Sequence, residues 1–543
     1  MTKYEDADGG AAETTYDAYG RPTTVTDGRG TQTLHYDVES GVLTSEEVSG
    51  VGTFTATYDA DGDLIERGLP NGLTAKTSYN LAGEPTALAY TKASSCGESC
   101  TWYEESLERS VEGRILTGTS SLVNDRYSYD KAGRLTEAQE APAGGECTSR
   151  AYTYDADSNR LAKTTRGPGV GGACPTSGGT TQSYKYDEAD RLEGPTYDAW
   201  GRITTLPGEF AGGKELKTSY FANNMVATQE QNAVTNTFQL DATGRQRQRE
   251  QTGGVAGTEI FHYNGPGDAP SWTALGSTWS RNIPGIGGEL AAVQESTGTT
   301  TFKLTDLHGD VVASASSSPT ATKLLATFRS SEFGEPLSGT SGRFGWLGGK
   351  SRRTELASGV IQMGARSYIP SLGRFLTPDP ILGGSANPYD YADQDPVNGF
   401  DLDGNCSSKK KCAAKAKKAK KKIEHRVNQI RSTMREARQA RQARTPTTRG
   451  NYGGISITLP WEHQIEHVVG GIENAVNGLL GKSCTEKAES FGWISGTATA
   501  GRITAKKVGT LAARHIAGWL SDIADGGALL GLGFGIAGAT GVC

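Results

Sequence analysis

The chain has 543 residues, of which 73 are glycine and only 35% are hydrophobic, and its formal net charge is −6. Glycine is nearly twice as frequent as its usual share of about 7%, which indicates many turns. The length allows several domains, although an all-β architecture can place much of the chain in one body. The small net charge excludes no class of partner, because an acidic N-terminal part is averaged with a strongly basic stretch after Lys409.

The first ten residues, MTKYEDADGG, contain no apolar segment. We therefore expect no signal peptide in this stretch, which is typical of the interior of a longer repetitive protein or of a truncated copy. If the protein is secreted or displayed at the cell surface, as its cysteines suggest, we expect another export route.

A short motif recurs through the first half of the chain. YDAYGR at residues 16–21 returns as YDKAGR at 129–134 and YDAWGR at 197–202, with looser copies that begin at residues 36, 58, 79, 154, 186 and 240. Successive copies are commonly about 20 residues apart, the length of one hairpin in a repeat array. The repeats therefore predict an ordered series of β-hairpins.

Each copy has the chemistry of a strand end followed by a turn. Threonine and tyrosine favour strands, aspartate bonds the backbone of its own turn, and glycine accepts a positive φ. One hairpin cannot bury its apolar face alone, so neighbouring hairpins must form a continuous sheet. Rows of tyrosine also bind carbohydrate in other proteins, but a tyrosine before every turn favours a structural role.

The eight cysteines are Cys96, Cys100, Cys147, Cys174, Cys406, Cys412, Cys484 and Cys543. Their even number and their position in loops favour disulfides and an oxidising destination, although the pairing does not follow from the sequence. Free thiols are the alternative. A zinc site at Cys96 and Cys100 would need a second ligand pair, which the sequence does not show nearby.

The repeats end in a passage that does not repeat. LTDLHGD at 304–310 and FGEP at 333–336 precede GARSY at 364–368, GRFLTPDP at 373–380, NPYDY at 387–391 and DPVNGFDLDG at 395–404. His308 has no nucleophile beside it in the sequence, so we assign it a structural role in a turn.

The repeats and this terminal passage together resemble the RHS/YD-repeat family, which includes bacterial polymorphic toxins, the C component of insecticidal toxin complexes, and teneurins. The resemblance covers about residues 10–404. It implies a mainly β fold in which YD-repeat hairpins form a spiral β-shell over residues 1–300. It also implies that an RHS core plug at 301–405 closes the shell, and that the shell encloses the C-terminal segment. The number of repeats suggests a partial or smaller cage.

In many relatives the plug resembles an aspartic self-cleaving device. That chemistry needs two carboxylates that share one proton. We predict Asp379 and Asp401 as the pair, with Asp403 as a competitor for the second role and Arg374 as the cation that orients a carboxylate. The same aspartates also suit simple turns, and the two roles are compatible.

The end of the plug departs from the family pattern. Relatives commonly end in Asp-Pro-x-Gly-Leu and are cut after the leucine, whereas this chain has Leu402 in place of the proline and Asn405 in place of the leucine. Gly404 and Asn405 therefore mark the candidate cleavage region, and the bond after Asn405 is the first candidate.

Residues 406–450 form a predicted basic helical linker. This stretch could contact nucleic acid, an anionic membrane or the acidic shell. It contains no aromatic residue between 409 and 449 to stack on a base, which disfavours specific single-strand recognition. A linker or electrostatic tether is the favoured interpretation.

Residues 451–543 form a variable, mainly helical segment that resembles an effector. Within it, HQIEH at 463–467 matches the spacing H-x-x-E-H, which would allow His463, Glu466 and His467 to bind zinc. Glu486, Glu489 and His515 are candidates for a third ligand. The alternative is a solvated helical face, and no other cofactor is predicted.

The last 18 residues, 526–543, carry no charge and alternate glycine with large apolar residues. They suit membrane contact or a buried helix of the effector. The leading functional hypothesis is a shell that delivers its own C-terminal segment in interbacterial or contact-dependent toxicity, with an immunity protein as a second partner. The alternatives are an extracellular adhesion or wall-associated repeat protein, and a zinc peptidase effector.

Overall fold

The computed structural model describes residues 2–93, 100–356, 358–381 and 385–405. This part of the chain is mainly β, as the repeats predict, and most of its strands belong to two large antiparallel sheets. Every strand in both sheets pairs with its neighbours in the sequence, so neither sheet contains a crossover.

The first sheet has 16 strands. They are β1 (Lys3–Glu5), β2 (Ala11–Tyr16), β3 (Pro22–Thr26), β4 (Thr31–Tyr36), β5 (Leu43–Val48), β6 (Gly52–Tyr58), β7 (Leu64–Gly68), β8 (Thr74–Tyr79), β9 (Pro85–Lys92), β10 (Cys100–Arg109), β11 (Ile115–Ser120), β12 (Val123–Tyr129), β13 (Leu135–Pro142), β14 (Thr148–Tyr154), β15 (Arg160–Arg166) and β16 (Thr180–Ser183).

The second sheet has 13 strands. They are β17 (Thr196–Tyr197), β18 (Ile203–Leu206), β19 (Leu216–Tyr220), β20 (Val226–Gln231), β21 (Val234–Leu240), β22 (Gln246–Thr252), β23 (Gly257–His262), β24 (Trp272–Leu275), β25 (Thr278–Pro284), β26 (Leu290–Glu295), β27 (Thr300–Thr305), β28 (Val311–Ser316) and β29 (Ala326–Thr327). The strands of this sheet therefore continue past residue 300.

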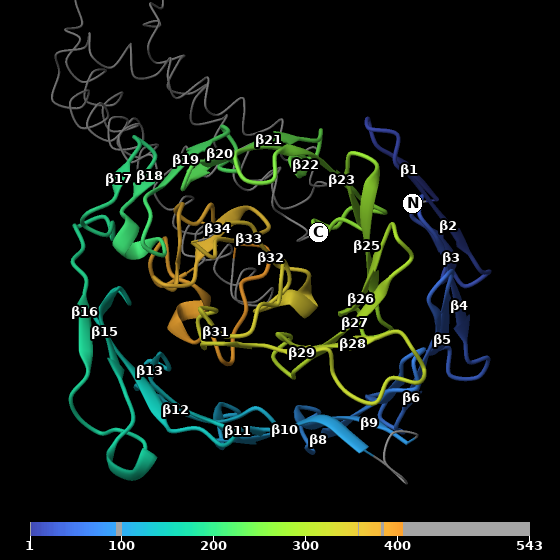
Figure 1. Cartoon of the computed structure of the whole chain (residues 1–543), viewed down its shortest axis with the longest axis horizontal. Coiled ribbons are helices and arrows are strands. Elements are labelled where there is room, and N and C mark those ends of the chain that lie inside the picture. Colours follow the sequence, from blue (N-terminus) through green and yellow to red (C-terminus); the bar gives the residue numbers. More distant parts are fainter. Residues whose placement is uncertain (1, 94–99, 357, 382–384, 406–543) are drawn as a thin grey trace, which may run out of the picture.

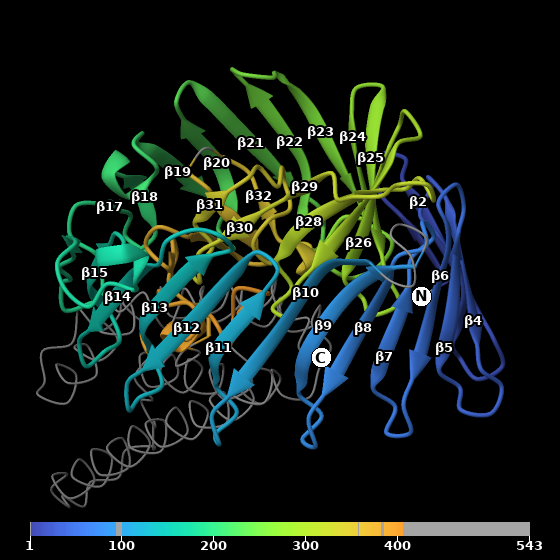
Figure 2. The same ribbon diagram turned by 60° about the horizontal axis from the view of Figure 1, so that its bottom comes forward.

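The two sheets follow one another around a ring (Figure 1). The first sheet forms the right, lower and left walls in that view, and β17–β23 form the upper wall. Strands β25–β28 then turn inward beside the N-terminal strands, so the end of the strip overlaps its beginning. Figure 2 shows the hairpins of the first sheet side by side along the wall. The described residues thus complete one turn of a shell.

Small strands and short helical turns fill the space inside the ring (Figure 1). The strands are β30 (Arg329–Ser330), β31 (Pro336–Ser338), β32 (Arg353–Thr354), β33 (Ile361–Met363), β34 (Arg366–Ile369) and β35 (Arg374–Phe375). The 3-10 turns inside the ring are η3 (Gly348–Lys350) and η4 (Ala392–Gln394), whereas η1 (Val170–Gly172) and η2 (Gly208–Phe210) lie in connections between wall strands. We call residues 329–405 the plug.

The repeat turns link each hairpin to the next one. In the turn after β2, Asp17 accepts hydrogen bonds from the backbone N–H groups of Tyr19 and Arg21, both at 2.9 Å, and from Nε of Arg21 at 2.7 Å. The guanidinium of Arg21 then stacks on the ring of Tyr36, 4.5 Å from its centroid, and donates to the carbonyl of Gly41 in the following turn. The hydroxyl of Tyr36 donates back to the carbonyl of Pro22.

The same set of contacts recurs around the ring. The aspartate, arginine and following tyrosine are Asp130, Arg134 and Tyr154, then Asp198, Arg202 and Tyr220, and then Asp241, Arg245 and Tyr263. The regular spacing between successive copies of the motif therefore has a structural cause, because each arginine must reach the tyrosine of the next hairpin.

Buried polar contacts join the beginning of the strip to its later strands. Arg281 on β25 is fully buried, and its Nε donates to Asp27 at 2.6 Å. The indole of Trp272 donates to the carbonyl of Asp27, also at 2.6 Å. Nearby, His262 contacts Asp6 at 2.7 Å and stacks on Trp272. We call these contacts the seam.

An apolar layer lies beside the seam, between the overlapping walls. Phe54 on β6 meets Phe302 on β27 edge to face, with the ring centroids 6.0 Å apart. Leu88 and Tyr90 on β9 and Ile283 on β25 belong to the same buried cluster. The main core of the shell therefore forms where two walls overlap, because a single sheet has no second layer against which to bury its inner face.

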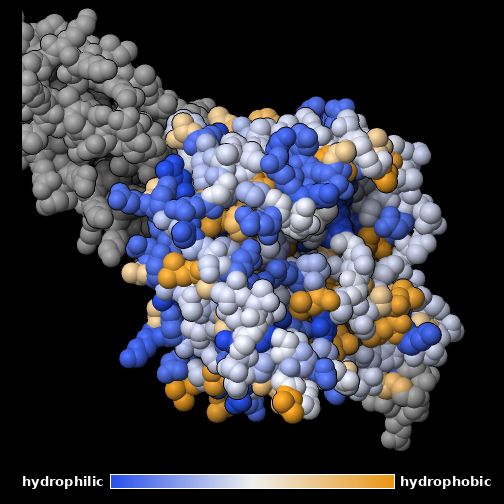
Figure 3. Space-filling model, turned by 60° about the vertical axis from the view of Figure 1, so that its left-hand side comes forward, coloured by the Kyte–Doolittle hydropathy of each residue, from blue (hydrophilic) through white to orange (hydrophobic). Residues whose placement is uncertain are grey.

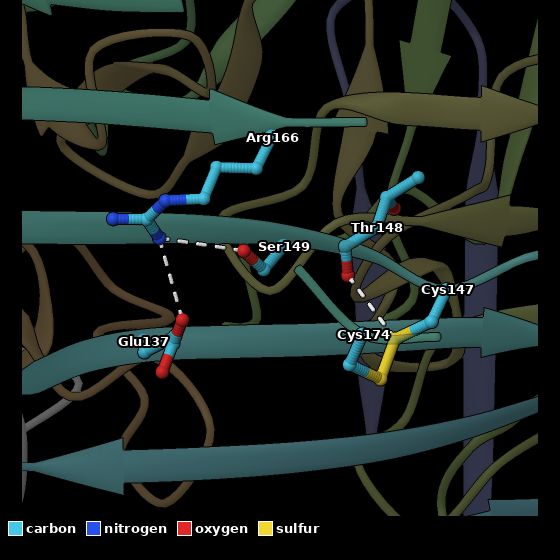
Figure 4. The surroundings of a disulfide bond; sticks show 6 residues. All are labelled: Glu137, Cys147, Thr148, Ser149, Arg166 and Cys174. Atoms are coloured by element: carbon cyan, nitrogen blue, oxygen red, sulfur yellow. Dashed lines mark hydrogen bonds and ion pairs between the residues drawn. A yellow bond between two sulfur atoms is a disulfide. The ribbon is translucent and has the colours of Figure 1, made fainter. Parts of the chain in front are cut away.

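Cys147 and Cys174 form a disulfide that ties the start of β14 to the loop before β16 (Figure 4). Arg166 on β15 donates to Ser149 on the adjacent strand β14 and to Glu137 on β13, one strand further along the sheet. The disulfide agrees with the expectation of oxidised cysteines in loops. Cys96, Cys406, Cys412, Cys484 and Cys543 lie outside the described residues.

The outer face that carries β15 and β16 is mostly hydrophilic, with hydrophobic side chains in small separate groups (Figure 3). Such a face suits contact with water. Within the part of the chain that the structure describes, no helix has the length and apolar character that crossing a membrane requires.

The seam predicts a large effect of removing one partner of its buried ion pair. We expect Arg281→Leu to destabilise the protein by about 3–5 kcal/mol, because it leaves the carboxylate of Asp27 buried without its cation. Thermal unfolding of the full chain would measure the loss. Lys3→Met, which removes an exposed ion pair with Glu5, is the control and should leave the melting temperature unchanged. Equal melting temperatures for the two variants would contradict the role of the seam.

Candidate functional site

Arg366 lies at the centre of a buried acidic cluster in the plug. It begins β34, and its residue is only 1% exposed. Its Nη2 donates to Asp401 at 2.7 Å and lies 3.4 Å from Asp379. The guanidinium also stacks on the ring of Phe375, 3.6 Å from its centroid. One buried cation therefore contacts both aspartates that the sequence predicts as a pair.

A tight hairpin brings Arg366 to this position. Met363 on β33 pairs with Arg366 on β34, so Gly364 and Ala365 form the whole turn. Gly364 has φ +51°, and a Cβ atom there would lie 2.4 Å from the carbonyl oxygen of Asp403. The N–H of Ala365 donates to that same carbonyl at 3.0 Å. The last loop of the plug thus packs directly on the backbone of the turn.

Asp379 is held by its own local backbone as well as by Arg366. Its carboxylate accepts hydrogen bonds from the N–H of Ile381 and the hydroxyl of Ser385, both at 2.8 Å. Burial is the largest influence on its pKa and the negative charge of Asp401 adds to it, while Arg366 and the hydrogen bonds act in the opposite direction. The net result raises the pKa of Asp379 to about 7.

Asp401 faces the end of the plug. Its Oδ1 accepts a hydrogen bond from the backbone N–H of Asn405 at 2.8 Å, and the residue is 1% exposed. The same N–H lies 3.1 Å from the carboxylate of Asp403. Asn405 is itself fully buried. The structure thus places the candidate cleavage region, Gly404 and Asn405, directly beside one carboxylate of the predicted pair.

Asp403 lies on the same loop and differs from Asp401 in its partners. Burial and the negative charge of Asp401 raise the pKa of Asp403 to about 6. Arg366 is among the weaker influences on Asp403, whereas it bonds directly to Asp401. The geometry favours Asp401 over Asp403 as the partner of Asp379. Among the contacts described, Arg366 bonds to Asp379 and to Asp401 but not to Asp403.

Arg374 does not have the position that the sequence analysis expected. Its Nη2 donates to the backbone carbonyl of Asp190, and its guanidinium stacks on Tyr186 and Tyr389. It therefore anchors the plug to the shell, and Arg366 is the arginine at the carboxylates. Both arginines belong to the same passage of sequence, and only the hairpin turn at Gly364 decides which of them faces the aspartates.

The sequence analysis also missed Asp390. This residue is 1% exposed, and its backbone forms a bridge with Arg374. Burial, together with the negative charge of Asp393, raises the pKa of Asp390 well above its ordinary value, although Arg366 opposes the shift. Its position in the segment NPYDY, which follows Asp379 closely, was the only signal of its role. It adds a further acidic group to those around a single arginine.

This arrangement raises the pKa of one buried carboxyl group into the neutral range. Arg366 supplies one positive charge to Asp379 and Asp401, and the raised pKa of Asp379 means that this group binds a proton near pH 7. A buried carboxyl pair with one proton can donate to a carbonyl or an amine and accept a proton from water. The site therefore has the groups that acid–base cleavage of a nearby peptide bond needs.

The other predicted sites cannot be placed. His463, Glu466 and His467, the basic linker at 406–450 and the apolar end at 526–543 lie outside the described residues. Among the residues that are described, no group of three or more histidine, cysteine, aspartate or glutamate side chains has an arrangement that could hold a metal ion.

Comparison with known proteins gives a likeness of fold. No protein-family model and no curated protein matches the sequence. Among solved structures, the chain is similar to the TcdB2-TccC3 complex, with a TM-score of 0.60 and 16% identity in the form without the hypervariable C-terminal region. Another structure of that complex has a TM-score of 0.59 and 17% identity. A mutated Tc holotoxin pore from Photorhabdus luminescens has a TM-score of 0.60.

These similarities cover 74% of this chain but only 21–22% of the matched chains. At this level of identity they show that the shell fold is shared. The chain thus spans about a fifth of the length of the structures that it matches.

The turn at Gly364 can be tested by adding a single methyl group. We expect Gly364→Ala to displace the loop that carries Asp401, because its Cβ would meet the backbone of Asp403. Gly62→Ala is the matched control, since Gly62 also has a positive φ, +87°, but nothing lies within 4 Å of its added Cβ. Both variants incur the backbone cost of about 1–2 kcal/mol. A melting temperature no lower for Gly364→Ala than for Gly62→Ala would show that the loop does not need this close approach.

Proposed function

We propose that this protein is an RHS/YD-repeat shell that encloses and delivers its own C-terminal segment, residues 406–543, as a toxin-like cargo. In this proposal the protein acts outside the cell that makes it, in interbacterial or contact-dependent toxicity. An immunity protein in the producing cell is the expected second partner. The plug cuts the chain near Asn405 and so separates the cargo from the shell.

The observation that carries the proposal is the contact of Arg366 with both Asp379 and Asp401 beside Asn405. Arg150 in the shell also bonds to two carboxylates, Glu140 and Glu332, so the feature that distinguishes this site is its place beside Asn405. The group is buried at the point where the chain leaves the plug. The ring-shaped shell and its likeness to Tc toxin components support enclosure of a segment.

The proposed reaction is hydrolysis of one peptide bond. Asp401 takes a proton from a water molecule, whose oxygen then bonds to the carbonyl carbon. Asp379 supplies a proton to the nitrogen of the bond that breaks. The products are a new carboxyl group on the shell fragment and a new amino group on the cargo, and no group is oxidised or reduced. For the bond after Asn405, these ends are the carboxyl of Asn405 and the amine of Cys406.

Arg366 positions the two aspartates in this scheme. Its hydrogen bond to Asp401 and its contact with Asp379 keep both carboxyl groups on one side of the loop. Its positive charge also limits how far burial raises the pKa of Asp379. Replacing it by a neutral residue would leave several acidic groups together without a cation.

Intact mass spectrometry of the purified full chain under denaturing conditions tests the proposal. We expect two fragments that meet near Asn405 in the parent protein, and one uncut chain in Asp379→Asn and in Asp401→Asn. Each substitution keeps the size of the side chain and removes its ability to exchange a proton. Asp61→Asn, in an exposed repeat turn, is the control and should be cut like the parent.

Two further results would contradict the proposal. An uncut parent chain would refute self-cleavage. Fragments in the Asp379→Asn variant would show that the chain is cut without the aspartate pair. Enclosure is tested separately, by adding an external protease under native conditions. The cargo should survive in the native shell and be digested once the shell is unfolded.

A further inference from the structure

His308 bridges the shell and the plug through both nitrogens of its ring. It lies in the turn between β27 and β28. Its Nδ1 is 3.0 Å from Oδ1 of Asp310 in the same turn, and its Nε2 is 2.9 Å from the backbone carbonyl oxygen of Pro396 in the plug. The two contacts join a shell turn to a loop that is 88 residues further along the chain.

Both ring nitrogens face acceptors. A carbonyl oxygen only accepts, so Nε2 must carry a proton to bond to Pro396. Oδ1 of Asp310 already accepts a hydrogen bond from the N–H of Leu347 at 2.8 Å, which places this carboxylate in an accepting role toward Nδ1 as well. A histidine that donates from both nitrogens is positively charged. The geometry therefore favours the imidazolium form of His308.

The surroundings of the ring agree with this charge. Burial by itself lowers the pKa of His308, but the negative charge of Asp310 and the hydrogen bonds to Asp310 and Pro396 outweigh burial, so the pKa rises above its ordinary value of 6.5. Glu105 on β10 acts in the same direction. Glu105, Asp306 and His308 all line one cavity of about 330 Å³, whose wall also includes Arg109.

The same ring packs against the residue that precedes Asp401. The ring centroids of His308 and Phe400 are 4.9 Å apart, and those of His308 and Trp346 are 6.1 Å apart. Pro396 and Phe400 are therefore both in contact with His308, at the two ends of the loop that leads into Asp401. The side chain of Asn398, in the middle of this loop, accepts a hydrogen bond from the N–H of Ile115 and donates one to the hydroxyl of Tyr129. An amide side chain does not titrate near neutral pH, so these two contacts do not depend on pH.

We propose that protonated His308 is a positioning residue that holds residues 396–400 against the shell and thereby holds Asp401 at Arg366. Loss of the proton removes the hydrogen bond to Asp310 or the one to Pro396, because a neutral ring can donate only once. Where Asp401 cleaves the chain, as under the proposed function, His308 sets the pH range over which that carboxylate is in place. The contact between shell and plug itself does not depend on cleavage.

The direction of the pH effect follows from the raised pKa. The stabilisation is fully present below the ordinary histidine pKa of about 6.5 and is lost as the pH rises through the folded value. The 396–405 region should therefore be more protected at pH 6 than at pH 9. Loss of one charge-assisted hydrogen bond should lower the protection of this region by roughly tenfold between the two pH values.

Two measurements on the full chain test the proposal. Exchange of the ring C–H hydrogen, followed by mass spectrometry, reports the pKa of individual histidines, and we expect a higher pKa for His308 than for the exposed His35. Amide hydrogen exchange, corrected for the intrinsic rate at each pH, reports protection of residues 396–405. A pKa of His308 at or below that of His35 would overturn the proposal.

Three variants separate a proton-dependent role from simple packing. His308→Gln keeps a donor for Pro396 but cannot gain a charge, so protection should change less between pH 6 and pH 9 than in the parent, where the remaining change comes from acidic groups such as Asp379 and Asp403. Asp310→Asn keeps an acceptor of similar size for Leu347 and should move the pH midpoint downward, because the negative charge is gone. His35→Gln should behave as the parent. An unshifted midpoint in Asp310→Asn would also overturn the proposal.

These outcomes do not depend on the cleavage experiment. A chain that is never cut but shows the pH-dependent protection would refute the proposed self-cleavage and leave the role of His308 intact. A chain that is cut equally at pH 6 and pH 9, with unchanged protection, would refute the role of His308 and leave self-cleavage intact.

Discussion

The structure depends on one contact that is repeated around the ring, in which an aspartate holds an arginine and the arginine reaches the next hairpin. A two-stranded hairpin is only marginally stable alone, since its apolar face has nothing to pack against. Asp17 satisfies the N–H groups of its own turn and orients Arg21, which then covers Tyr36 of the following hairpin. Each hairpin is therefore linked to its successor, and the sheet grows in chain order without a crossover.

Closing this strip into a ring places charged groups far from water, at the seam and in the plug. At the seam, Arg281 faces Asp27 and the charges are matched. In the plug, one arginine faces Asp379 and Asp401, with further acidic groups close by. Because burial of an unmatched negative charge is costly, the pKa of Asp379 is raised to about 7, and this group takes up a proton as the pH falls through neutrality. This difference distinguishes the cluster around Arg366 from the ion pair at the seam.

The sequence analysis predicted the repeat turns and the mainly β fold, because these depend on residue type and local spacing, and it named Asp379 and Asp401, which the structure brings to one arginine. It assigned Arg374 to the carboxylates, where the structure has Arg366. The two arginines lie in one passage of similar composition, and the choice between them depends on how a two-residue turn packs against the Asp403 backbone. His308 was correctly assigned to a turn, but its contact with Pro396 joins elements 88 residues apart and left no local signal.

The sequence by itself determined the hairpin unit, since a strand-forming tyrosine, a turn-forming aspartate and a glycine with positive φ act within a few residues of one another. Only the tertiary structure decided that the strip overlaps itself, because Arg281 and Asp27 are 254 residues apart and nothing in either segment specifies the other. The same holds for the cluster around Arg366. Which buried carboxyl group keeps a proton is set by the distances among charges and by the exclusion of water, and both arise only after the shell and the plug have packed together.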